Sequence, residues 1–167
     1  MALIRVGLIS DTHGLLRPEA VDFLQGSDMI IHCGDICDPG VIRQLSAIAP
    51  VTAVRGNNDT GAWANELPDT QILRIGEIFA YVIHDIAGID IDPQASGVAV
   101  VLSGHSHKPS IICRDGITYV NPGSAGPRRF KLPISAGELM VEGGSVVPRI
   151  VEFGDAGGAR DRAQPVA

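Results

Sequence analysis

Five apolar segments of this chain each end in side chains that can bind a metal ion or carry a proton. Thiols are absent from these positions, apart from Cys33 before Gly34. In open α/β sheets, sites form in the loops beyond the carboxyl ends of the strands, so neighbouring strands would bring these side chains together. The five groups are Asp11-x-His13, Gly34-Asp35, Gly56-Asn57-Asn58-Asp59, His84-Asp85 and Gly104-His105-Ser106-His107.

The mixture of imidazole and carboxylate groups favours a transition-metal site. Mn, Fe, Zn and Ni accept such ligands, whereas Ca and Mg prefer oxygen alone. In D-x-H and H-x-H, alternate side chains point to one side of an extended segment, so both can reach one cluster. Two cations about 3.5–4 Å apart usually need a shared carboxylate, and Asp35 in its Gly-Asp turn is the natural bridge. The pattern therefore predicts a dinuclear metal centre.

Each motif alone also has a structural explanation. A D-x-H segment can cap a helix, Gly-Asp is a turn signal, and an isolated histidine at a strand end is more often a satisfied polar group. The five together, in order and each after an apolar run, favour the metal centre.

His32 is expected to be a packed residue at a strand end, with a supporting role in the site as the alternative. For the basic run Arg128, Arg129 and Lys131, a solvated loop is expected, and contact with a substrate phosphate is the alternative.

The segments that carry these motifs predict an α/β half followed by a β-rich half. Strands at 3–9, 29–32 and 51–54 alternate with helices at 18–25 and 39–48, which predicts a parallel arrangement. A further strand is expected at 98–102, and hairpins at 70–75/78–83, 110–113/117–120 and 135–141/145–151. Two stacked sheets with helices outside would accommodate both halves. We expect one domain over residues 1–153 and a disordered tail over 154–167, which is rich in Gly, Ala and charge.

The composition supports one globular domain and argues against two classes of binding partner. Of the 167 residues, 45% are apolar but only 4% aromatic, so the core must consist of Val, Ile, Leu and Ala. The net charge of −6 argues against nucleic acid and anionic membranes as partners. No segment approaches the roughly 20 apolar residues of a membrane span, and no signal peptide pattern opens the chain. These features, with three cysteines that cannot all pair, favour a cytoplasmic location.

The five motifs, in this order, resemble those of the calcineurin-like metallophosphoesterase superfamily. Over about residues 3–152 the chain is similar to the small single-domain phosphodiesterases of bacteria and archaea, including their late loop at Asn121-Pro122-Gly123-Ser124 and Pro127-Arg128. The resemblance implies an α/β fold, a four-layer α/β/β/α sandwich of two stacked mixed sheets flanked by helices. It also implies two divalent metal ions, with manganese expected first and Fe, Zn or Ni as alternatives.

The resemblance implies a role for each matched residue. Asp35 would bridge the two metals, the first held also by Asp11, His13 and His107. The second metal would be held also by Asn57, His84 and His105. Catalytic roles would fall to Asn57, Asp59 and His84, and substrate contacts to Asn58 and Arg128.

Two positions depart from the family pattern. Many members have His directly after the motif Asn, where it assists the leaving group. This chain has Asn58 there, and an amide cannot act as a general acid at neutral pH. His84 is followed by Asp85, where the family often has Gly-His. Departure of the leaving group would then rely on metal-bound water, Asp59 or His84.

The expected function is metal-dependent hydrolysis of a small phosphate ester by a metal-bridging hydroxide, with activated diesters preferred over monoesters that have poor leaving groups. The alternative is a phosphoesterase-like scaffold, similar to the retromer subunit of this superfamily, that binds partner proteins with little or no catalysis. A nuclease is disfavoured because the chain lacks a basic stripe. The assembly state stays open, a homo-oligomer included.

Overall fold

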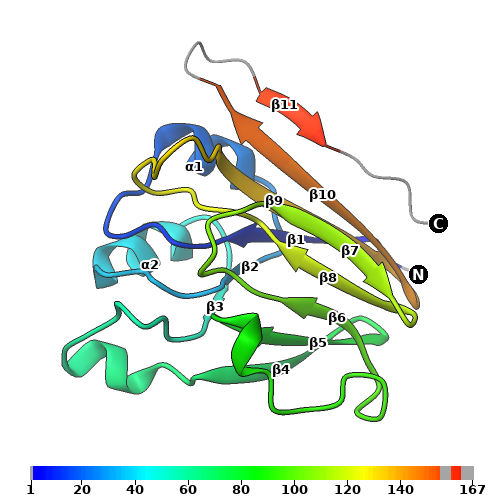
Figure 1. The fold of residues 1–167 in the computed structure, drawn as a ribbon. Helices are drawn as coiled ribbons and strands as arrows, with labels where there is room; N and C mark the ends of the chain where they lie inside the picture. The colour runs from blue at the N-terminus through cyan, green and yellow to red at the C-terminus, as the bar shows by residue number, and fades with distance from the viewer. Residues whose placement is uncertain (1, 155–158, 163–167) are drawn as a thin grey trace.

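The computed structural model describes residues 2–154 and 159–162, and its framework is two stacked mixed β-sheets (Figure 1). The six-stranded sheet has the order β11-β10-β9-β1-β2-β3 and the five-stranded sheet the order β4-β5-β6-β8-β7. The strands of the first are β1 (Ile4–Ile9), β2 (Met29–His32), β3 (Val51–Ala53), β9 (Ile134–Glu142), β10 (Ser145–Phe153) and β11 (Ala159–Arg162). Those of the second are β4 (Thr70–Ile75), β5 (Ile78–Ile83), β6 (Val98–Leu102), β7 (Ser110–Arg114) and β8 (Ile117–Asn121). The predicted α/β sandwich of stacked mixed sheets is confirmed.

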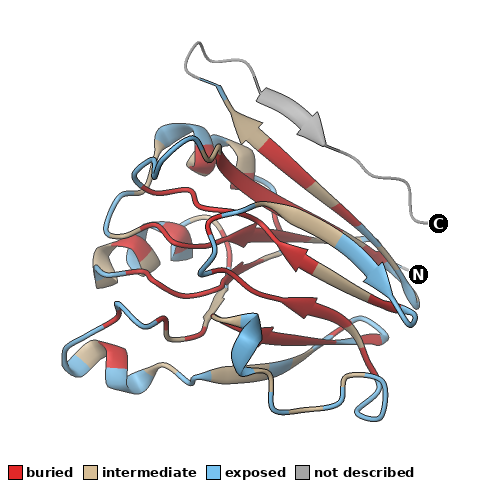
Figure 2. Ribbon diagram, in the orientation of Figure 1, coloured by how far each residue is buried: buried red, intermediate tan, exposed pale blue. Residues whose placement is uncertain are grey.

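Aliphatic side chains from both sheets fill the space between them. Leu8 and Ile31 from one sheet meet Val82 and Leu102 from the other, all of them fully buried. Figure 2 shows the buried residues concentrated along the facing strands. Strands covered on both faces become nearly continuous apolar runs, which explains why the sequence pattern located them.

Two helices, α1 (Pro18–Leu24) and α2 (Pro39–Ser46), cover the outer face of the six-stranded sheet. Proline opens each helix, where its missing N–H costs no hydrogen bond. The Asp38 side chain caps α2 by accepting a 2.7 Å hydrogen bond from the Gly40 amide. Both helices lie close to their predicted positions.

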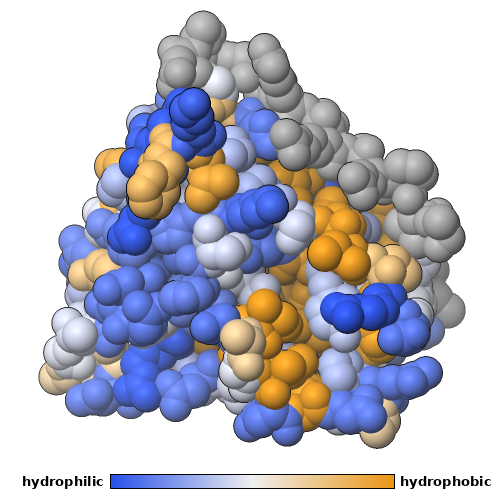
Figure 3. Space-filling view, viewed as in Figure 1, coloured by the Kyte–Doolittle hydropathy of each residue, from blue (hydrophilic) through white to orange (hydrophobic). Residues whose placement is uncertain are grey.

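The outer face of the five-stranded sheet carries a thinner layer than the implied helical one. In the described part of the chain it consists of the 3₁₀ turn η2 (Ile86–Gly88) and the segment after it, whose Ile89 and Ile91 pack against the cluster that includes Tyr81. Gly88, Pro93 and Gly97 interrupt this segment, so a longer helix is disfavoured. A second 3₁₀ turn, η1 (Ala62–Glu66), follows β3. Figure 3 shows apolar residues gathered in the centre and right of the view, where this sheet lies.

The C-terminal segment differs in part from the predicted disordered tail. Residues 159–162 form β11, which pairs antiparallel with β10 in a register that sets Asp161 opposite Val151. An edge strand offers unpaired backbone N–H and C=O groups, so a segment can join it without an apolar pattern. Residues 155–158 and 163–167 lie outside the described part of the chain. No helix within the described ranges is long and apolar enough to cross a membrane.

Candidate metal centre

The loops after the parallel strands meet at one edge of the sandwich and are tied to each other through their backbones. The loop after β1 lies along the loop after β2, with hydrogen bonds from the Asp11 amide to the Gly34 carbonyl and from the His13 amide to the Asp35 carbonyl, both 3.0 Å. The loop after β6 joins the loop after β5 through a 2.9 Å bond from the Gly104 amide to the His84 carbonyl. This framework fixes where the polar side chains project.

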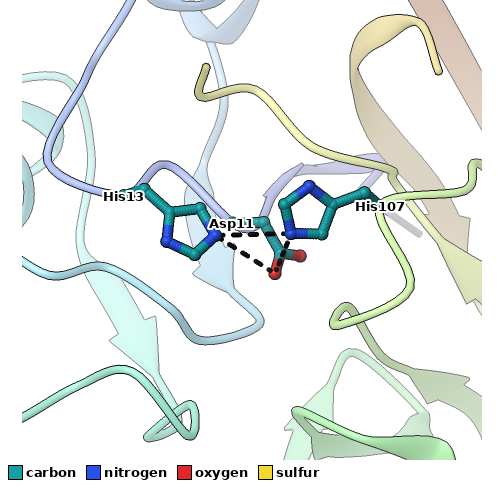
Figure 4. A group of neighbouring side chains, drawn as sticks. All are labelled: Asp11, His13 and His107. Carbon is teal, nitrogen blue, oxygen red and sulfur yellow. Dashed lines mark hydrogen bonds and ion pairs between the residues drawn. The ribbon is translucent and has the colours of Figure 1, made fainter. Parts of the chain in front are cut away.

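Asp11, His13 and His107 form a first group whose polar atoms face one another (Figure 4). The Nε2 atoms of His13 and His107 lie 3.3 Å apart. Asp11 Oδ1 lies 3.2 Å from Nε2 of His107 and 4.0 Å from Nε2 of His13. One carboxylate and two imidazoles therefore converge on a single point.

Asn57, His84 and His105 form a second group beside the first. Asn57 Oδ1 lies 3.1 Å from Nε2 of His84 and 3.0 Å from Nδ1 of His105. Asp35 stands between the two groups, since its Oδ2 lies 3.7 Å from Nε2 of His13 and its Oδ1 3.4 Å from Nε2 of His84. The structure thus brings all seven predicted ligands together, with Asp35 where a shared carboxylate would be needed.

The donor set fits divalent cations. Asp11 is fully buried, and its Oδ1 has no hydrogen-bond partner in the described part of the structure. A buried carboxylate oxygen that accepts no hydrogen bond is costly, and a cation between Asp11, His13 and His107 would satisfy it. The ligand types, three carboxylate or amide side chains and four imidazoles, suit a transition metal.

Backbone strain is concentrated on these residues. Non-glycine residues rarely adopt positive φ, yet Asp11, Asp35 and His107 have φ of 53°, 54° and 59°. His13 and His105 share this left-handed conformation, at 46° and 65°. Such strain costs about 1 kcal/mol or more at each residue and clusters at functional sites, where it fixes the direction of side chains.

Hydrogen bonds set the charge and orientation of Asp35 and His84. Burial alone would raise the pKa of Asp35, but hydrogen bonds from His84 and from both the backbone and side-chain amides of Asn58 lower it well below its usual range. Burial alone would lower the pKa of His84, but Asp35 and the Cys33 carbonyl, 2.7 Å from Nδ1, raise it. With Nδ1–H directed to that carbonyl, Nε2 faces the centre.

Asp59, Asn58 and Arg128, which are predicted to act in catalysis or substrate binding, differ from one another in their contacts. Both carboxylate oxygens of Asp59 accept backbone hydrogen bonds, 2.7 Å from the Cys37 amide and 2.8 Å from the Gly56 amide. The Asn58 side chain donates to Asp35 Oδ2 at 2.7 Å. Asp59 and Asn58 therefore brace the loops that carry the ligands. Arg128 is exposed, in the loop between β8 and β9.

Arg129, which follows Arg128 in the basic run, lies against the first group. Its guanidinium Nη2 lies 3.4 Å from Nε2 of His13. Burial lowers the pKa of His13, and the positive charge of Arg129 lowers it further, against the opposite effect of Asp35. The basic run was the sequence signal for this contact, although Arg129 was not singled out within it.

A cleft of about 610 Å³ opens beside the second group. Asn57, His84 and His105 form one wall. Four carboxylates, those of Asp59, Asp69, Asp85 and Asp90, also line it, together with Arg55. Arg55 is already paired with Asp69 at 2.7 Å. The cleft can hold a small molecule and carries excess negative charge.

Comparison with known proteins places these features in a family. A probable metallophosphoesterase of Methanocaldococcus jannaschii is 41% identical over 133 residues, which cover 71% of this chain and 67% of that protein. One of Methanothermobacter thermautotrophicus is 32% identical over 161 residues, covering 89% of this chain and 92% of the relative. The fold is similar to that of vacuolar protein sorting 29 from Cryptosporidium parvum, with a TM-score of 0.84 at 19% identity over 97% of each chain.

A family model supports the same assignment. The model of the calcineurin-like phosphoesterase superfamily domain matches residues 4–144, which include the five motifs and both sheets apart from β10 and β11. The match covers most of the chain, and both archaeal relatives are named probable metallophosphoesterases. This chain belongs to the calcineurin-like metallophosphoesterase superfamily.

Proposed function

We propose that this protein is a metal-dependent phosphodiesterase that hydrolyses small phosphate esters at a dinuclear centre. The observation that carries the proposal is the position of Asp35, whose two carboxylate oxygens face His13 on one side and His84 on the other. A carboxylate in this place, held ionised by hydrogen bonds, is what two adjacent cations require.

The two groups described above would each hold one cation, with Asp35 shared. Asp11, His13 and His107 would bind the first, and Asn57, His84 and His105 the second. Two divalent cations, manganese being expected first and Fe, Zn or Ni as alternatives, would polarise the phosphoryl group and lower the pKa of the attacking water.

The chain's own residues would bind and orient the ester. The Arg129 guanidinium lies against the first group and would bind a phosphoryl oxygen. The hydrogen bond from His84 Nδ1 to the Cys33 carbonyl would keep the imidazole directed at the centre. Asn57 would hold its amide oxygen between His84 and His105.

One feature of the site favours activated leaving groups, and another favours diesters over monoesters. Asn58 cannot donate a proton as an acid, and both oxygens of Asp59 already accept backbone hydrogen bonds. A leaving group would therefore depart without a proton from either residue. The carboxylates that line the cleft also repel a dianionic monoester more strongly than a monoanionic diester.

The test compares bis(p-nitrophenyl) phosphate with p-nitrophenyl phosphate after chelator treatment and reloading with Mn, Fe, Zn or Ni, alongside elemental analysis. We expect metal-dependent turnover with the diester preferred. Asp35→Asn should reduce both metal content and turnover, whereas Asp115→Asn, in the exposed turn between β7 and β8, should change neither. Equal turnover of the monoester would contradict diester preference. Full metal occupancy without turnover of any ester would favour the partner-binding scaffold.

A further inference from the structure

The loop between β8 and β9 carries an exposed aromatic ring between two cations. Phe130 is 93% exposed, well above the other exposed large hydrophobic side chains of the described residues. Arg129 and Lys131, on either side of it, are exposed as well. In Figure 3, hydrophobic and strongly hydrophilic residues lie side by side at the upper left, where Figure 1 places this loop.

The backbone makes Phe130 unusual for its position. The Leu132 amide donates to the Arg129 carbonyl at 3.2 Å, which closes a four-residue turn with Phe130 at its first central position. The φ of Phe130 is +54°, a conformation for which turns normally use Gly or Asn. Neither this conformation nor the exposure of the ring stabilises the fold. We therefore expect the ring to contact a ligand that is not part of the chain.

The turn is fixed to the metal centre. Arg129 Nη2 lies 3.4 Å from Nε2 of His13. The start of the loop is held by a 2.9 Å bond from Ser124 Oγ to the Asp11 carbonyl and a 3.2 Å bond from Arg17 Nε to the Gly126 carbonyl. Phe130 therefore belongs to a turn that reaches the centre through its neighbour Arg129.

We propose that Phe130 determines substrate specificity by stacking on a planar aromatic group, of nucleobase type, on the ester arm that is not the leaving group. The inference rests on the proposed function and names the substrate class of that site: a small phosphodiester with an aromatic arm. Arg129 binds the phosphoryl group, and the ring of Phe130 covers the aromatic group beyond it. Stacking of one base on an aromatic side chain corresponds to about 5- to 150-fold in affinity.

The experiment uses two diesters with the same leaving group, thymidine 5′-(p-nitrophenyl phosphate) and methyl p-nitrophenyl phosphate. Phe130→Ala should lower kcat/KM for the thymidine ester by about 5- to 150-fold, mainly through KM, and leave the methyl ester within about twofold. Phe130→Trp should restore the preference. Phe79→Ala, which removes an exposed ring from β5, serves as the control and should change neither substrate.

Other outcomes would overturn the inference. If Phe130→Ala lowers kcat/KM equally for both esters, Phe130 only supports the loop. If it lowers kcat/KM for neither ester, Phe130 does not contact the substrate. If Phe130→Ala loses binding to anionic phosphatidylserine vesicles while turnover of both esters is unaffected, the ring contacts a membrane surface instead.

A result that contradicts the proposed function can be told apart from one that contradicts the role of Phe130. In that case wild-type protein would turn over neither ester with any metal. Calorimetry then compares thymidine 5′-phosphate with inorganic phosphate on the same metal-loaded protein. Weaker binding of the nucleotide alone in Phe130→Ala would uphold the stacking role, and unchanged nucleotide binding would overturn it.

Discussion

His32 Nε2 lies 3.0 Å from Thr12 Oγ1, and this contact joins the two loops that carry Asp11, His13 and Asp35. The Gly34 amide donates to Nδ1 of His32 at 3.2 Å, so Nε2 carries the proton and donates to Thr12. Thr12 in turn faces the Ile36 carbonyl at 3.3 Å. The buried imidazole is therefore neutral and braces the centre from behind, beyond the packing role expected from its place at the end of β2.

This arrangement predicts a specific loss of stability in acid. Burial lowers the pKa of His32 to about 3, from 6.5 for an ordinary histidine. Below pH 6.5 the unfolded chain binds a proton that the folded chain does not, so stability falls as the pH drops towards 3, roughly tenfold in the unfolding equilibrium constant per pH unit. Urea unfolding of metal-free protein between pH 7 and 4.5 measures this slope.

His32→Gln should flatten that slope, since it removes the titrating group and keeps an amide donor. Thr12→Val provides the matched control: it removes the contact but leaves the imidazole, so the slope should persist at lower overall stability. Wild type and both variants keep every other histidine, so a difference in slope reports on His32 alone. The same slope in wild type and His32→Gln would contradict the prediction.

Gly104 is expected to be essential to the geometry of Asp11. A Cβ at Gly104 would overlap Ser10 Oγ and lie 2.7 Å from Asp11 Oδ2. Gly104→Ala should therefore displace the carboxylate and weaken metal binding by about 10- to 100-fold, the range seen when the supports of a ligand are lost. The control is Gly144→Ala, where a Cβ meets open space. Chelator competition with Mn measures both variants, and equal affinities would contradict this view of Gly104.

The sequence located the ligands because five regular apolar runs, in order, each end in a potential ligand. Asp35 and His107 follow apolar runs, and parallel neighbours bring the carboxyl ends of such runs together. Irregular loops offer no periodicity, so the contact between Arg129 and His13 could not be predicted from spacing. The bracing role of Asp59 depends on amides of Cys37 and Gly56, and backbone donors are not visible in residue types. Strand β11 likewise depends on backbone pairing with β10.

Asn58 is expected to act through Asp35. Its backbone and side-chain amides donate to the two Asp35 oxygens at 2.8 and 2.7 Å. Asn58→Ala should weaken Mn binding by about 10- to 100-fold, with a smaller effect on KM at saturating metal. A direct substrate contact would give the opposite pattern, a higher KM with unchanged metal affinity. Metal titration and steady-state kinetics on the same preparation separate the two roles.

We expect the left-handed conformation of Phe130 to lower the free energy of unfolding, while its ring serves substrate recognition. A left-handed conformation costs a non-glycine residue about 1–2 kcal/mol, and glycine avoids this at a cost of about 0.5–1 kcal/mol in backbone entropy. Because the exposed ring contributes little packing, Phe130→Gly should raise the free energy of unfolding by about 0.5–1 kcal/mol. Phe79→Gly, on strand β5 without positive φ, should lower it. Denaturant unfolding of metal-free protein measures both, and a loss of stability in Phe130→Gly would mean that the ring holds the loop in place. A gain would mean that the fold tolerates a strained turn in order to present an aromatic ring beside Arg129 and the metal centre.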